Sequence, residues 1–202
     1  WSKTIVKSED MKMSLGIKGI QVIPNGVDLV KFKPLDQIEC KKKLKWNCNK
    51  KQILFASNPN RYEKNYPLAK KAIDGFENPN FELKVLKEVP SNQMVFYYNA
   101  SDVVILTSNR EGSPNVIKEA MACNRPIVAT DVGDIKWLFG NTKGCFISSD
   151  KINDLENKIC SALNFSDKYN EIEGRRRIKM LKLDSGSVAK KLVFMYEAIK
   201  KQ

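Results

Sequence analysis

The chain has 202 residues, enough to enclose one full hydrophobic core, and 42% hydrophobic with 29% charged residues is typical of a soluble globular domain. No apolar run approaches the roughly 18 residues of a membrane-spanning helix. The net charge of +12 favours an anionic partner, namely a nucleotide, a nucleic acid or a membrane surface.

Histidine is absent, which excludes a histidine-based triad, a histidine metal site and a histidine general base within this chain. The cysteines are odd in number and scattered, with no C-x-x-C pair, at positions 40, 48, 123, 145 and 160. This pattern indicates free thiols in a reducing cytoplasm. Because the chain starts with Trp1 and shows no secretory signal, we interpret it as part of a longer protein.

The N-terminal residues 1–19 show no clear hydrophobic period. A short strand is predicted to begin at Gln21 and to run into an Asn-Gly turn at Asn25 and Gly26. We interpret residues 1–19 as the remnant of a connection between domains.

The densest basic run is CKKKLKWNCNKK, at residues 40–51. It predicts the solvated face of a helix with Cys40 and Leu44 turned inward. A membrane-facing patch is the functional alternative. RNA binding is less favoured, because no aromatic pair is interleaved as a stacking platform.

A strand, a polar loop and a helix are predicted next. The apolar residues 52–56 form the strand, and Pro67 opens the helix. The loop between them contains two cations, Arg61 and Lys64. This order is the geometry of a ligand loop at the edge of a sheet.

Two further strands are predicted at residues 81–86 and 102–107, with a short helix at 91–99 between them. The second strand is apolar throughout its interior, which indicates a central, buried position. Repeated alternation of strand and helix favours an α/β fold, with a parallel sheet that helices cover on both faces.

The stretch from Ser108 to Asp134 carries the strongest functional signal. Ser113 is predicted to be the N-cap of a helix at 115–123, with Pro114 at the first helical position. The first amides of this helix, at Asn115 and Val116, have no partner inside it. They lie at the positive end of the helix dipole, so an anion is favoured there.

Glu119 lies one turn beyond Asn115, on the same face of the predicted helix. A carboxylate behind a phosphate site suits hydroxyl groups, such as those of a ribose. A buried strand at 126–130 and a polar turn at 131–134 follow. Ligands of open α/β sheets collect at the edge where such strands end.

The C-terminal third is predicted to add a helical turn at 135–139, a strand at 144–147, a helix capped by Ser149 or Asp150 and a basic helix at 173–183. A final helix carries an apolar stripe that we assign to the core: Val188, Leu192, Met195, Tyr196 and Ile199.

Glu111 and Glu119 are the two glutamates of E-G-S-P-N-x-x-x-E-A-M-A, which is followed by P-I-V-A-T-D-V-G. This string resembles the E-x7-E signature of the retaining GT-B glycosyltransferases of family 4. The segment V-I-P-N-G-V-D at 22–28 is similar to the one that leads into the C-terminal half of those enzymes. The resemblance implies a Rossmann-like, nucleotide-sugar-binding domain over residues 20–202.

The resemblance also implies an activity, which is transfer of a sugar from a nucleotide diphosphate sugar to an acceptor with retention of anomeric configuration. No cofactor and no essential metal are expected, and a role in cell-surface polysaccharide or glycoconjugate synthesis is implied. Catalytic roles fall to Lys64, Glu111 and Glu119. The implied donor-binding residues are Arg61, Lys64, Val89, Gly112, Ser113, Asn115, Val116 and Glu119.

Two positions depart from the family pattern. Asn124 stands where glycine is common, but a helix end there can accept asparagine in a left-handed conformation, so the fold is compatible with it. Residues 57–60 lack the usual glycine-arginine pair, so the diphosphate-binding role known in the family is assigned to Lys64 more directly than to Arg61.

The implied partners are a nucleotide-sugar donor and an acceptor held by a preceding N-terminal domain. We expect a cytoplasmic location, with peripheral contact at the inner face of the membrane and no nucleic acid. One alternative is a catalytically silent module that binds a nucleotide sugar and regulates a partner. Another is a basic domain that binds nucleic acid or a membrane surface, with steep salt dependence and no role for Glu119.

Overall fold

A computed structural model of the chain describes residues 3–76 and 80–200. Its centre is a parallel sheet of five strands in the order β4-β3-β5-β6-β7, which confirms the predicted α/β class. The strands are β3 (Lys51–Phe55), β4 (Phe81–Val85), β5 (Val103–Leu106), β6 (Ile127–Thr130) and β7 (Cys145–Ser148). Residues 1, 2, 201 and 202, at the outer ends of the two predicted segments, lie outside the described residues.

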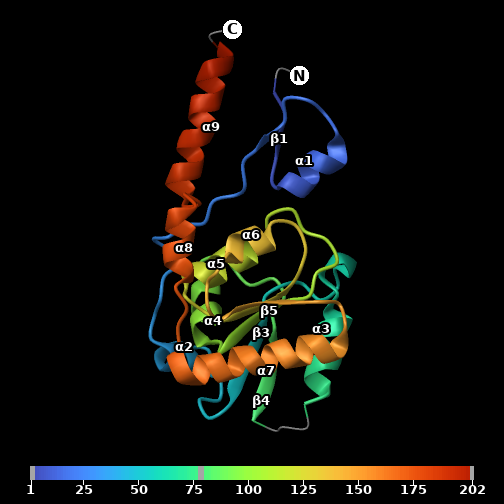
Figure 1. Cartoon of the computed structure of the whole chain (residues 1–202). Helices are drawn as coiled ribbons and strands as arrows, with labels where there is room; N and C mark the ends of the chain where they lie inside the picture. The colour runs from blue at the N-terminus through green and yellow to red at the C-terminus, as the bar shows by residue number, and fades with distance from the viewer. Residues whose placement is uncertain (1–2, 77–79, 201–202) are drawn as a thin grey trace.

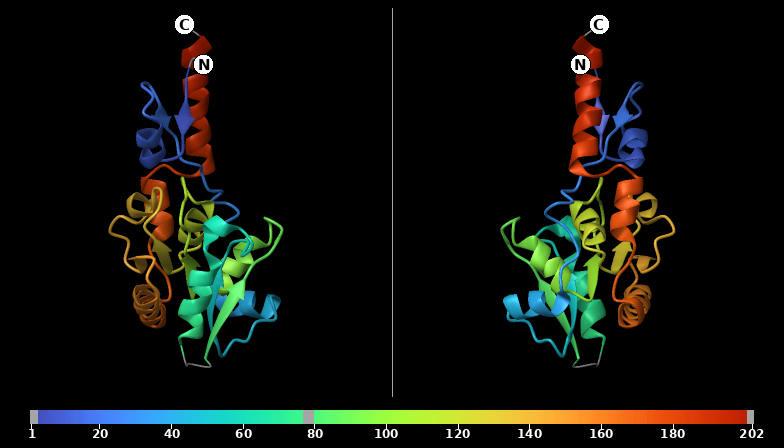
Figure 2. Two further views of the ribbon diagram at one scale, coloured as in Figure 1. Left: turned by 90° about the vertical axis from the view of Figure 1, so that its right-hand side faces the viewer. Right: turned by 90° about the vertical axis from the view of Figure 1, so that its left-hand side faces the viewer.

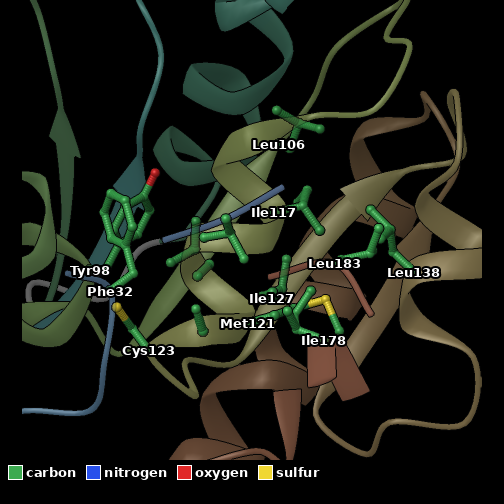
Figure 3. Close-up of a cluster of buried hydrophobic side chains, with 14 of the residues drawn as sticks. Phe32, Tyr98, Leu106, Ile117, Met121, Cys123, Ile127, Leu138, Ile178 and Leu183 are labelled. Atoms are coloured by element: carbon green, nitrogen blue, oxygen red, sulfur yellow. The ribbon is translucent and has the colours of Figure 1, made fainter. Parts of the chain in front are cut away.

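Helices cover both faces of the sheet, because alternate strand residues point to opposite sides (Figure 1). Ile53 and Phe55 pack on one side with α3 (Tyr66–Asp74) and α7 (Ile152–Tyr169). Leu54 belongs to the larger core on the other side. That core is built with α4 (Met94–Ala100), α5 (Asn115–Ala122), α6 (Ile135–Phe139) and α8 (Gly174–Met180), and part of it is drawn in Figure 3.

The N-terminal residues form a small unit of their own, in which β1 (Ile5–Val6) and β2 (Gln21–Val22) pair in parallel around α1 (Glu9–Leu15). This unit and α9 (Ser185–Lys200) extend from the same end of the body (Figures 1 and 2). Helix α1 was not predicted from the sequence, and none of its residues is buried. Its N-cap Ser8, which accepts from the amide of Met11 at 3.3 Å, was the available signal.

Two predicted helix caps are wrong. Helix α5 begins at Asn115, so Pro114 is its N-cap residue and not its first helical residue, and no side chain caps the helix. The hydroxyl of Ser113 donates to the carboxylate of Asp134. Helix α7 begins after Lys151, and neither Ser149 nor Asp150 caps it. At the first of these sites the helix begins one residue later than predicted, so Ser113 lies outside the capping position.

The basic run at 40–51 is only partly a solvated face. Helix α2 (Gln37–Lys43) turns Cys40 inward as predicted, and Leu44 is half-buried. Lys41, however, is buried and donates to Asp102 at 3.0 Å. The prediction that the lysines are all solvated is therefore wrong at Lys41, because a carboxylate at the start of β5 offers a buried partner.

The prediction that the apolar stripe on α9 belongs to the core is also only partly correct. Val188 and Met195 are buried, but Tyr196 is 57% exposed, which contradicts its assignment to the core. The helix extends away from the body, so few of its side chains have a neighbour to pack against (Figure 1).

Candidate functional site

The strand order reverses between β3 and β5. From β3 the chain crosses to β4 on one side of it and then returns to β5 on the other side. The loops that leave the carboxyl ends of β3 and β5 therefore part in opposite directions, and such switch points are where open α/β sheets bind ligands. The first loop contains η1 (Tyr62–Lys64), and the second contains Glu111.

These two loops bring Lys64 and Glu111 together. The Nζ atom of Lys64 lies 2.6 Å from Oε1 of Glu111, and the two side chains are only 14% and 12% exposed. The hydroxyl of Ser108 donates to the same oxygen at 2.8 Å. Thr107 ties the loops together by donating to the carbonyls of Lys64 and Asn65, at 3.1 and 3.0 Å. Two predicted catalytic residues thus form one charged pair at the switch point.

Gly133, in the turn after β6, packs directly against the backbone of the Glu111 loop. Its φ is +59°, and a Cβ atom there would lie 2.5 Å from the carbonyl oxygen of Gly112 and 2.8 Å from that of Glu111. The amide of Asp134 donates to the Gly112 carbonyl at 3.2 Å. Sequence reasoning placed this turn at the ligand edge but missed its support of the loop, which only the tertiary contact reveals.

Glu119 lies on α5 and accepts a hydrogen bond from the hydroxyl of Tyr98 at 2.7 Å. Burial raises the pKa of the Glu119 carboxyl, while the hydrogen bond from Tyr98 and the charges of Lys31 and Lys118 oppose this rise. Tyr98 is fully buried. Nothing in the sequence pairs it with Glu119.

Lys118 is a second residue that sequence reasoning missed. Its side chain is fully buried, and Nζ donates to the carbonyl of Ser113 at 3.2 Å. Burial lowers the pKa of Lys118 to about 8, against the opposing charge of Asp134. The available signal was a lysine next to the buried Ile117, in a stretch that is otherwise apolar on that side.

The other predicted residues occupy separate positions. Arg61 is exposed and pairs with Glu63. Val89 is half-buried in the loop between β4 and α4, and at the start of α5 Asn115 is exposed and Val116 half-buried. Their predicted roles in binding a donor stay predictions.

A hollow of about 630 Å³ borders Glu111, between α1 and the loops at 109–111 and 131–133. A larger one, of about 810 Å³, lies between the end of α6, α7 and α8 and includes none of the predicted site residues. We place the candidate site beside Glu111, because the charged pair and the sheet edge coincide there.

All five cysteines are free, as expected. Among residues 3–76 and 80–200, no three histidine, cysteine, aspartate or glutamate side chains are grouped so that they could hold a metal ion. The helices of this part of the chain are all too short or too polar to cross a membrane. The predictions on metal and location stay predictions.

Comparison with known proteins gives a family match. The family described as glycosyl transferases group 1 matches residues 47–164, more than half of the chain. A stretch of 56 residues is 43% identical to TuaC of Bacillus subtilis strain 168, a glycosyltransferase assigned to teichuronic acid biosynthesis. That stretch is 28% of this chain and 14% of TuaC.

Solved structures share the fold. Sucrose-phosphate synthase of Thermosynechococcus elongatus superposes with a TM-score of 0.82 at 17% identity, over 98% of this chain and 58% of its own. A glycosyltransferase from Rickettsia africae ESF-5 gives 0.82 at 18%, over 100% and 64%. HepE of Anabaena in complex with UDP gives 0.80 at 18%, over 98% and 64%. The chain therefore spans less than two thirds of the length of these structures.

Proposed function

The chain belongs to the family of glycosyl transferases group 1, and we propose that it is the donor-binding half of a retaining glycosyltransferase. The donor is a nucleotide diphosphate sugar. The family match and the GT-B fold of the solved relatives support this proposal. The HepE structures, which were solved with UDP and with UDP-glucose, support a nucleotide-sugar donor.

The observation that carries the proposal is the Lys64–Glu111 pair at the switch point. A lysine ammonium has three N–H donors, and Glu111 occupies one of them. The others remain available to a phosphate oxygen. Negative charge grows on the diphosphate as the bond from sugar to phosphate breaks, and a positioned cation stabilises that charge more in the transition state than in the ground state.

The remaining site residues contact different parts of the nucleotide-sugar donor. In this proposal the first amides of α5, at Asn115 and Val116, bind the diphosphate with help from Arg61, and Glu119 accepts from the ribose hydroxyls. Glu111 lies near the donor sugar, where it orients hydroxyls and favours developing positive charge. Val89 borders the base.

The whole protein's activity follows from a second half that holds the acceptor. We propose that this half precedes the described residues, and that the protein acts in the synthesis of a cell-surface polysaccharide or glycoconjugate. The segment similar to TuaC supports that role. A cytoplasmic site of action, with peripheral contact at the membrane, completes the proposal.

This chain alone is expected to bind a donor but to transfer no sugar. Its polar site opens at the edge of one sheet, and the described residues form one wall of a cleft there. Alignment of an acceptor by a second wall can supply several kcal/mol of the barrier, about 7–11 at best. The assay is release of nucleoside diphosphate from radiolabelled donors, with and without a separately expressed N-terminal half.

Efficient acceptor-dependent transfer by these 202 residues alone would contradict the half-enzyme proposal. Donor binding without transfer even when the second half is supplied would favour the silent binding module instead.

A further inference from the structure

Tyr98 places a polar group at the end of a fully buried ring. The ring packs edge-on against Phe32, with the ring centroids 5.9 Å apart. Figure 3 shows the two rings together at one end of the core cluster, with the Tyr98 oxygen directed away from Cys123. The hydroxyl donates to Oε2 of Glu119 at 2.7 Å, across the boundary between α4 and α5.

We infer that Tyr98 is a positioning residue that fixes the carboxylate of Glu119 through its hydroxyl and leaves the second carboxylate oxygen to accept from ribose hydroxyls. This inference rests on the proposed function, which gives Glu119 the ribose. Tyr98 itself does not touch the nucleotide.

The geometry supports a division of labour between the two oxygens of Glu119. Oε2 accepts from Tyr98, whereas Oε1 has no hydrogen-bond partner in the part of the chain that the structure describes. A glutamate side chain otherwise has several rotamers, and ordering it costs free energy when a ligand binds. Because the Tyr98 ring is fully buried, its hydrogen bond orders the Glu119 carboxylate before a ligand binds.

The surroundings of Glu119 determine its charge. Facing it are Tyr98 on α4, Lys31 on the segment before α2, and Lys118 on its own helix. Cys123, one turn further along, is buried, and its thiol is uncharged because burial raises its pKa to about 12. Burial raises the pKa of Glu119, and the Tyr98 hydrogen bond is the largest opposing effect.

Removal of the Tyr98 hydroxyl should therefore act in two ways. The carboxylate loses its fixed orientation at every pH, and its pKa rises further. With a higher pKa, Glu119 of the variant is protonated at a higher pH than Glu119 of the parent. A protonated carboxyl accepts poorly from ribose hydroxyls. The loss of affinity caused by Tyr98→Phe should grow as the pH is lowered.

The test is calorimetric titration of a nucleoside diphosphate that the parent chain binds, between pH 5.5 and 8. We expect Tyr98→Phe to weaken binding by about tenfold at neutral pH, the size of a modest hydrogen bond to a charged group. The factor should increase toward low pH. Titration of the ligand's own phosphate is common to both proteins and cancels in the ratio.

Tyr97→Phe is the matched control, since Tyr97 is the neighbouring residue on α4 and packs its ring on Trp46. It should bind like the parent at every pH. In a Glu119→Gln background, the titrating carboxylate is gone, so the cost of Tyr98→Phe should no longer depend on pH.

Two results would overturn the inference while leaving the proposed function intact. One is binding by Tyr98→Phe within about twofold of the parent. The other is a loss of nucleotide affinity from Tyr98→Phe that is the same at every pH in the chain that retains Glu119, as a general packing defect would give. Absence of nucleotide binding by the parent chain would instead remove the proposed function, and this inference with it.

Discussion

Replacement of Lys64 by methionine is expected to weaken binding of a nucleoside diphosphate by about 1.5–3 kcal/mol, roughly ten- to hundredfold. Methionine keeps the apolar stem of the side chain but removes the ammonium that the site presents at the switch point. Binding of the parent mononucleoside should be unchanged, because it has no phosphate for Lys64 to contact. Calorimetric titration of both ligands measures the two effects.

Lys70→Met is the matched control for this variant. Lys70 lies on α3, immediately after the Lys64 loop, and is exposed and paired with Asp74. It removes the same net charge without touching the site. Equal losses from the two variants would show a long-range effect of charge and would contradict direct contact by Lys64. Unfolding curves should accompany the titrations, because Ser108 is the one donor that Glu111 keeps among residues 3–76 and 80–200 once Lys64 is gone.

Gly133→Ala is expected to lower the free energy of unfolding by about 2–4 kcal/mol. The alanine would have to adopt a φ of +59° and would drive its Cβ atom into the backbone of Glu111 and Gly112. Backbone atoms cannot move aside as the end of a side chain can, so the loop that carries Glu111 must shift. Urea unfolding measures the loss of stability, and nucleotide titration measures its effect on the site.

Gly16→Ala separates the two causes. Gly16 has a nearly identical φ of +62°, but nothing lies within 4 Å of the Cβ position there. It should therefore show the conformational cost of a left-handed alanine alone, about 1–2 kcal/mol. If the two variants lost the same stability, the close approach of Gly133 to the Glu111 loop would have no energetic consequence.

Much of the fold could be predicted from the sequence because the strands are short apolar runs between polar loops. Helix α6 was predicted at its observed bounds, residues 135–139, and the strand at 102–107 contains β5. Asn124 has a φ of +55°, the left-handed conformation that asparagine can adopt in place of glycine at a helix end. Helix α1 could not be predicted from periodicity, because it has no buried face.

The candidate site, like the fold, contains some residues that could be predicted from the sequence and others that could not. Lys64 and Glu111 could be predicted to meet, because each follows a strand of one parallel sheet and all such loops lie at one edge. The supporting residues could not be predicted, since the contacts of Tyr98 and Gly133 join segments that are far apart in the chain. Ser113 satisfied a capping pattern, but the carboxylate that takes its hydroxyl lies 21 residues away.

The central claim is that the edge of the sheet beside Lys64 and Glu111 binds the diphosphate of a nucleotide. The most direct measurement is thermal unfolding of the chain with uridine, guanosine and adenosine, each compared with its diphosphate. At about 100 times its dissociation constant, the correct diphosphate should stabilise the fold by on the order of 2.7 kcal/mol, and its nucleoside by far less. Equal stabilisation by a nucleoside and its diphosphate, or none by any diphosphate, would contradict the account.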